Sequence, residues 1–120
     1  METKICTSIE QSKKLLSLGL DADTADMWYL PIKDTYELVI TPSLTRGIIP
    51  AWSLSALLEL MPILLKGYWR WILTRHNRGY SCTYLNGGET FHSKGGKTDI
   101  DAAYNMVVYL LEQGYIKTEK

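Results

Sequence analysis

Basic and aromatic side chains are mixed in the middle of the chain, a combination that suits the binding of nucleic acids. Basic groups neutralise phosphates, and aromatic rings stack on unpaired bases. Residues 64–97 contain six basic residues but only one acidic residue, Glu89. The candidate contacts to nucleic acid are Arg70, Arg75, Arg78, Lys94 and Lys97. The aromatic residues among them are Trp69, Trp71, Tyr80 and Tyr84.

The alternation of side chains along a β-strand bears on whether these rings can reach a ligand, because successive residues point to opposite faces. One face carries Trp69, Trp71, Leu73 and Arg75, and the other carries Arg70, Ile72 and Thr74. The tryptophans share their face with a leucine, so we expect them to pack against helices. Nucleic-acid binding through residues 64–97 is therefore the alternative prediction for this chain, not the leading one.

A cysteine, a histidine and a carboxylate in the same region suggest a second chemistry, that of a thiol enzyme. A cysteine nucleophile needs a neighbouring histidine that a carboxylate orients, and Cys82, His92 and Glu89 are the nearest such trio. However, Cys82 lies neither at the start of a predicted helix nor in a strained turn, and we expect it to be a half-buried strand residue. A small enzyme based on Cys82 and His92 is a third hypothesis, and no catalytic residue is assigned.

A sequence that resembles the end of a phosphate-binding loop precedes the last predicted helix. It consists of Gly95, Gly96, Lys97 and Thr98. The phosphate-binding loop also requires a glycine five residues before Gly96, and this chain has Phe91 there. We therefore expect a glycine-containing loop that leads into a capped helix, and no cofactor.

Residues of metal-binding type are present, but their spacing does not match known metal sites. Asp21, Asp23 and Asp26 resemble the opening of a calcium loop whose glycine and final glutamate are missing. Structural zinc sites have pairs of ligands a few residues apart, and no two of Cys6, His76, Cys82 and His92 have that spacing. The last three would form a cluster only if they met across the predicted strands, so no metal ligand is assigned.

Three helices are predicted from capping residues and from the spacing of apolar residues. The first covers roughly residues 9–18, and the last has one continuous apolar stripe from Ile100 to Leu111. The expected N-caps are Thr7 or Ser8, Ser53, and Thr98 or Asp99, and the expected stops are Gly19, Pro62 and Gly114.

The remaining segments favour strands because they are rich in aromatic and β-branched residues. Residues 27–29 and 36–41 are expected to form a loose hairpin, in which Pro31 and Pro42 limit the pairing. Residues 69–75, 80–85 and 89–92 are expected to form a three-stranded antiparallel meander. Its turns are predicted at residues 77–79 and at Asn86 and Gly87, a pair typical of type I′ turns.

The composition is that of one ordinary globular domain covering residues 1–120, with 46% hydrophobic and 22% charged residues. Two cysteines and the absence of a signal-like apolar stretch near the start predict a cytoplasmic protein. The apolar run 48–65 contains two prolines and is short for a bilayer span of about 20 residues. It is therefore predicted to be a buried helix followed by a strand, and not a membrane segment.

These elements predict a two-layer α+β fold. An antiparallel sheet, made of the meander with the N-terminal hairpin as a further part, would be packed by two or three helices. The helices near Ser53 and Asp99 are expected to cover one face of the sheet. For the opposite face the sequence leaves three alternatives: it is exposed to solvent, it is covered by the first helix, or it binds a second copy of the chain or a protein partner.

Four stretches of the chain carry a resemblance at the level of whole segments. They are residues 8–12, 24–27, 50–62 with Trp52, Ser53 and Leu54, and 101–116 with Asp101, Ala102, Ala103, Met106, Gly114, Tyr115 and Ile116. In these stretches the chain resembles uncharacterised small proteins of gut Bacteroides-type bacteria and of their phages or prophages. The resemblance implies an accessory protein of a phage or mobile element, and it transfers no activity to any residue.

The leading prediction for function is a small non-enzymatic interaction protein whose exposed apolar and aromatic residues bind a partner. It is motivated by the resemblance and by the lack of polar residues that converge on a recognisable catalytic pattern. A protein partner or self-association is expected, and nucleic acid is the alternative partner.

Overall fold

The computed structural model describes residues 4–41, 46–67, 69–116 and 118. Within them, two antiparallel three-stranded sheets and three α-helices are present, which confirms the predicted α+β class. In chain order the elements are α1 (Ile9–Ser17), the short 3-10 helix η1 (Ala22–Thr24), β1 (Met27–Ile32), β2 (Thr35–Val39), β3 (Ile49–Ala51), α2 (Leu54–Leu60), β4 (Arg70–His76), β5 (Gly79–Asn86), β6 (Glu89–Gly96) and α3 (Asp99–Glu112).

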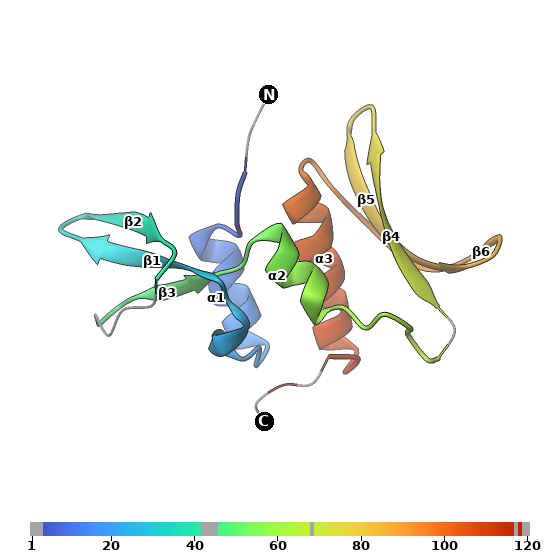
Figure 1. Ribbon diagram of the computed structural model, residues 1–120, viewed down its shortest axis with the longest axis horizontal. Coiled ribbons are helices and arrows are strands. Elements are labelled where there is room, and N and C mark those ends of the chain that lie inside the picture. Colours follow the sequence, from blue (N-terminus) through green and yellow to red (C-terminus); the bar gives the residue numbers. More distant parts are fainter. Residues whose placement is uncertain (1–3, 42–45, 68, 117, 119–120) are drawn as a thin grey trace.

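The helices lie between the two sheets (Figure 1). The first sheet has the strand order β2–β1–β3, and the second sheet has the order β4–β5–β6. The molecule measures 51 × 38 × 19 Å, which reflects this side-by-side arrangement of sheet, helices and sheet. The second sheet has one face toward the helices, whereas the first sheet meets them through its edge strand β3.

The predicted helices are confirmed, and their N-caps explain where they begin. Ser8 and Gln11 form a capping box at α1, with Ser8 Oγ accepting from the Gln11 amide and Gln11 Oε1 accepting from the Ser8 amide. Ser53 caps α2, and Thr98 caps α3. In the described part of the chain, no helix is long and apolar enough to cross a bilayer.

The second sheet confirms the predicted meander, but β6 is four residues longer than expected. The expected loop at Gly95 and Gly96 is wrong, since both residues belong to β6. Gly96 passes very close to the first turn of α3, where a Cβ atom would lie 2.5 Å from the Ala102 amide nitrogen. The strand can reach the helix only because glycine has no side chain.

The turn between β5 and β6 is also shifted by one residue from the prediction. Asn86 is the last residue of β5 and pairs with Glu89, so Gly87 and Gly88 form the turn. Only Gly87 has a positive φ, of 62°, which is the pattern of a type II′ turn and not of type I′.

The prediction of a helix followed by a strand in the apolar run 48–65 is wrong, because in the structure the strand comes before the helix. The strand β3 precedes α2 and pairs with β1 at the edge of the first sheet. Pro50 is tolerated there because an edge strand need not donate every backbone hydrogen bond. Pro42, which entered the strand predictions, lies outside the described residues.

The core is one cluster of buried side chains that connects the helices to the second sheet. α3 packs against all three strands of this sheet, whereas α2 packs mainly against α3. Cys82 and Tyr84 of β5 are fully buried beneath the helices. The expected cover of one sheet face by helices two and three is thus provided chiefly by α3, and α1 packs against β3 of the first sheet instead.

Candidate binding surfaces

A hollow of about 620 Å³ lies where the tip of the β4–β5 hairpin meets the start of α3. We call it the basic hollow, because its charged residues are four cations and one carboxylate. They are Lys4, Arg75, Arg78, Lys97 and Asp99.

Three separate segments bring these cations together. Arg75 is opposite Tyr80 on the helix-facing side of the second sheet, and Arg78 lies in the turn between β4 and β5. Lys97 follows the last residue of β6 directly. At this point a side chain on Gly79 would clash with the carbonyl oxygen of Gly96. Close contact between two glycines therefore brings the hairpin turn next to Lys97.

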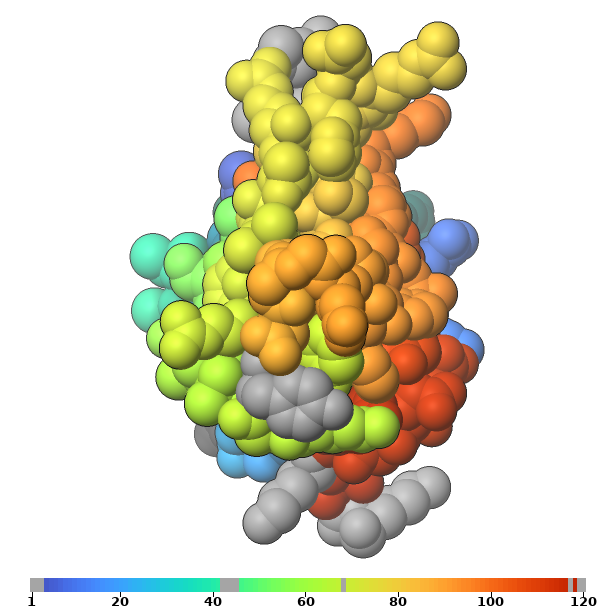
Figure 2. Space-filling view, turned by 90° about the vertical axis from the view of Figure 1, so that its right-hand side faces the viewer, coloured from blue at the N-terminus to red at the C-terminus, as the bar shows by residue number. Residues whose placement is uncertain are grey.

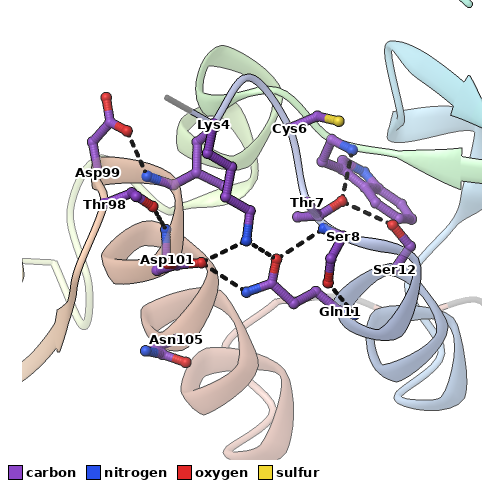
Figure 3. Close-up of polar contacts among 12 residues, drawn as sticks. Lys4, Cys6, Thr7, Ser8, Gln11, Ser12, Thr98, Asp99, Asp101 and Asn105 are labelled. Atoms are coloured by element: carbon purple, nitrogen blue, oxygen red, sulfur yellow. Dashed lines mark hydrogen bonds and ion pairs between the residues drawn. The ribbon is translucent and has the colours of Figure 1, made fainter. Parts of the chain in front are cut away.

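Lys4 reaches the basic hollow from the N-terminal segment, where it is held by α1 and α3 (Figure 3). Its Nζ lies 2.7 Å from Asp101 Oδ1 and donates to Gln11 Oε1 at 2.6 Å. Gln11 also donates to Asp101 Oδ1 at 2.9 Å. This group, the Lys4–Gln11–Asp101 clasp, joins the beginning of the chain to the first turn of α3.

The clasp changes the pKa of Asp101. Burial by itself raises the pKa of this carboxyl, but the hydrogen bonds from Lys4 and Gln11 and the charge of Lys4 outweigh it, so the pKa is lowered overall. Among the described residues, Lys4–Asp101 is the only ion pair. Arg75, Arg78 and Lys97 therefore keep uncompensated positive charge at the basic hollow.

Two of the amides at the start of α3 that could bind an anion are already occupied. Thr98 Oγ1 accepts from the Asp101 amide at 3.0 Å, and Asp99 Oδ1 accepts from the Ile100 amide at 2.8 Å. A phosphate loop needs such amides, together with a positive helix end that no carboxylate neutralises. The cations, and not the helix end, make this surface attractive to anions.

A second hollow, of about 350 Å³, lies at the other end of β4. We call it the apolar hollow, and it is lined by Ile63, Leu64, Arg70 and Trp71. Ile63 is 82% exposed and Leu64 is 45% exposed. Ile72, which is 47% exposed, follows on the outer face of the same strand. Such a group of large apolar side chains in solvent is unfavourable unless something covers it.

Among the described strand residues, the outer face of the second sheet carries mainly Ser and Thr side chains, together with Ile72 and His76, and no Trp, Tyr or Phe. Thr83 and Ser93 are opposite each other and hydrogen-bond at 2.7 Å, and Ser81 is hydrogen-bonded to His76 at 2.6 Å. The predicted alternation along β4 is confirmed, because Trp71 and Leu73 pack against the core while Ile72 is exposed. The sheet therefore offers no row of tryptophan or tyrosine rings on which successive bases can stack.

The structure brings together only part of the predicted nucleic-acid site. Arg75, Arg78 and Lys97 share the basic hollow. Arg70 lies at the apolar hollow, roughly 17 Å along the strand from Arg75 at 3.3–3.4 Å per residue. Lys94 does not line the basic hollow. Its Nζ lies 5.6 Å from the centre of the Tyr109 ring, with which it forms a cation–π contact. Sequence reasoning missed Lys4, and only the tertiary fold reveals its position.

Cys82, His92 and Glu89 do not form an activated nucleophile. Cys82 Sγ contacts the sulfur of Met61 at 3.9 Å, and desolvation raises the pKa of this thiol to about 12. The ring of His92 is stacked on Tyr109, with 3.7 Å between the ring centres, and its Nε2 is buried without a hydrogen-bond partner in the described chain. Burial and then the charge of Lys94 lower the pKa of His92. Glu89 is exposed at the β5–β6 turn.

The residues of metal-binding type are dispersed as well. Over residues 4–41, 46–67, 69–116 and 118, no three His, Cys, Asp or Glu side chains are grouped closely enough to hold a metal ion. Asp21 instead caps η1 by accepting from the Asp23 amide, and Asp26 binds the amide and hydroxyl of Ser53. These aspartates have structural roles in capping helices.

Comparison of the chain with models of known protein families, with curated proteins and with solved structures gave no match. The geometry of the two hollows is therefore the basis for a functional assignment.

Proposed function

We propose that this protein is a small non-enzymatic accessory protein that binds nucleic acid through the basic hollow. The observation that carries the proposal is the convergence of Arg75, Arg78 and Lys97 on one hollow, without an acidic partner for any of them among the described residues. Cations that the fold leaves uncompensated attract phosphates and release the counterions condensed on nucleic acid. The resemblance to small phage and mobile-element proteins suits a role of this kind.

Binding to labelled DNA in a fluorescence-anisotropy titration tests the proposal. If two or three phosphates are neutralised, the affinity should fall roughly 12-fold to 40-fold between about 50 and 200 mM salt. The triple variant Arg75→Gln, Arg78→Gln, Lys97→Gln should lose most of the binding and nearly all of the salt dependence. Each of the three residues is exposed, so the variant should fold normally.

The matched control is Arg70→Gln, which removes one positive charge from the same strand at the apolar hollow. It should change the affinity less than twofold. Equal losses in Arg70→Gln and in Arg75→Gln would show that only total charge matters and would contradict a site at the basic hollow. The absence of DNA or RNA binding at low salt would remove the proposal altogether.

A second candidate function is self-association through the apolar hollow. The observation in its favour is the exposure of Ile63, Leu64 and Ile72 beside β4, which is an edge strand of the second sheet. A second copy can present the same apolar residues and the same unpaired strand edge across a two-fold axis. This surface would provide the protein partner that the sequence favours.

Sedimentation velocity over a range of concentrations tests this second candidate. A dimer should form in the wild type, and Ile63→Asp should shift the protein to monomer. Ile40→Asp is the control, since Ile40 is also exposed but follows β2 of the first sheet. A wild-type protein that stays monomeric at all concentrations would contradict self-association through this surface.

A further inference from the structure

The β4–β5 hairpin ends in a narrow tip that stands clear of the rest of the second sheet (Figure 2). His76 and Gly79 form its last pair, so Asn77 and Arg78 alone make the turn. β6 reaches along β5 only as far as Tyr80. Beyond that point, the tip consists of the His76–Gly79 pair and the turn, and both turn residues are exposed.

The two turn residues are of the types that read base edges in the major groove of DNA. Arginine forms a bidentate contact with guanine, and asparagine forms one with adenine. No ion pair or hydrogen bond of the Asn77 or Arg78 side chain is found within the described chain. Both are therefore available to a ligand that the tip approaches.

The dimensions of the tip also fit this groove. Paired strands are about 4.8 Å apart, and the major groove, about 12 Å wide, admits a two-stranded β-ribbon. Arg75 and Lys97 lie behind the tip, at the basic hollow. When the tip is inserted, these two cations are placed near the phosphates at the groove rim.

Double-stranded DNA fits the structure better than a single strand does. Proteins that bind single strands combine cations with aromatic rings on which bases stack. Here Tyr84 is fully buried and Trp71 packs against the core, so that among the described residues Tyr80, which is partly buried, and His76 are the only rings that line the basic hollow. The hollow therefore has several cations and the two turn residues but no row of rings along which successive unpaired bases could stack.

From these observations we infer that the tip of the β4–β5 hairpin enters the major groove of double-stranded DNA. Asn77 and Arg78 contact base edges there, and Arg75 and Lys97 contact phosphates. This inference rests on the proposed function, because it names the form of nucleic acid that the same surface binds.

A comparison of four probes tests the choice of duplex. They are a DNA duplex of about 20 base pairs, or two helical turns, each of its two strands, and an RNA duplex of the same sequence. The DNA duplex should bind about tenfold more tightly than the other three. The major groove of an RNA duplex is too deep and narrow for side chains to read. Equal or tighter binding of a single strand or of the RNA duplex would overturn the inference while leaving the proposed function intact.

A selection of duplexes with random central base pairs tests the base contacts. The wild-type protein should enrich a preferred sequence that contains guanine, and the variant Asn77→Ala, Arg78→Ala should enrich none. In the enriched duplex, replacement of that guanine by 7-deazaguanine should weaken wild-type binding roughly tenfold and leave the double variant unchanged. Enrichment of no sequence by the wild type would overturn the base-reading role. The melting temperature of the double variant, expected to equal that of the wild type, controls for folding.

Discussion

The two sheets have the same number of strands but are buried very differently. In the second sheet, the middle strand β5 carries Cys82 and Tyr84 beneath α3, and both are fully buried. In the first sheet, no residue of β1 or β2 is fully buried, and only the short edge strand β3 lies in the interior. The second sheet is thus part of the core, whereas the first sheet is attached to the core by one edge.

Helix cover, more than strand pairing, accounts for this difference in burial between the two sheets. α3 presents a continuous apolar stripe to the second sheet. The β1–β2 hairpin extends away from the helices (Figure 1). Within it, Tyr29 and Tyr36 form an edge-to-face aromatic pair. A hairpin with so little burial has marginal stability by itself.

The largest expected difference between the sheets comes from truncating one tyrosine in each. Tyr84→Ala should lower the free energy of unfolding by about 4 kcal/mol, because it leaves a large cavity in the core. It also removes the hydrogen bond from Tyr84 Oη to the Pro62 carbonyl oxygen. Tyr36→Ala, at a position 42% exposed, should cost less than about 1 kcal/mol. Urea unfolding of both variants measures the contrast, and equal losses would contradict it.

An intermediate effect is expected from the contact between β6 and α3. Gly96→Ala should destabilise the protein by about 2 kcal/mol, since its Cβ would meet backbone atoms of Asp101 and Ala102 that cannot move aside. Gly88→Ala, in the open turn of the same hairpin, has nothing within 4 Å of the added atom and should change stability by less than about 0.5 kcal/mol. Thermal unfolding distinguishes the two. A neutral Gly96→Ala would mean that the strand and the helix are less closely packed than described.

The smallest expected effect concerns the Lys4–Gln11–Asp101 clasp, which joins the helix beside the first sheet to the helix on the second. The pKa of Asp101 lies below its ordinary value of 3.8 in the folded protein. Its stabilising contribution is therefore complete above about pH 4 and is lost as the pH falls through the lower folded pKa. Asp101→Asn should cost less than about 1 kcal/mol at neutral pH, and the difference from the wild type should shrink in acid.

A double-mutant cycle with Lys4→Gln provides the control for the clasp. The coupling between the two substitutions, measured by urea unfolding, should be present at neutral pH and absent at pH values well below 3.8. A coupling that does not change with pH would show that the contact is steric and not electrostatic.

Much of the secondary structure could be predicted because its causes are local. Ser8, Ser53 and Thr98 each provide an oxygen for an unpaired helix amide, and they do so wherever the helix lies. The strands of the meander follow from residue type and alternation. The strand β3 could not be predicted, because three residues around Pro50 become a strand only through pairing with β1.

The candidate site was accessible to sequence reasoning only in part, for a similar reason. The excess of basic residues in 64–97 pointed to Arg75, Arg78 and Lys97, which line the basic hollow. It pointed equally to Arg70 and Lys94, which lie at the apolar hollow and against Tyr109. Lys4 is distant in sequence from the hairpin and reaches the basic hollow only through the clasp. Charge along a chain does not reveal which charges end up adjacent.

The sequence by itself determined where the helices begin, which face of β4 is apolar and which segment is rich in cations. These properties depend on neighbours a few residues apart, so they are readable from spacing alone. The tertiary structure decided that the strands form two sheets, that β6 runs through its glycines onto α3, and that four of the cations share one hollow. Those outcomes depend on close approach between distant segments, and such contacts are fixed by packing in three dimensions.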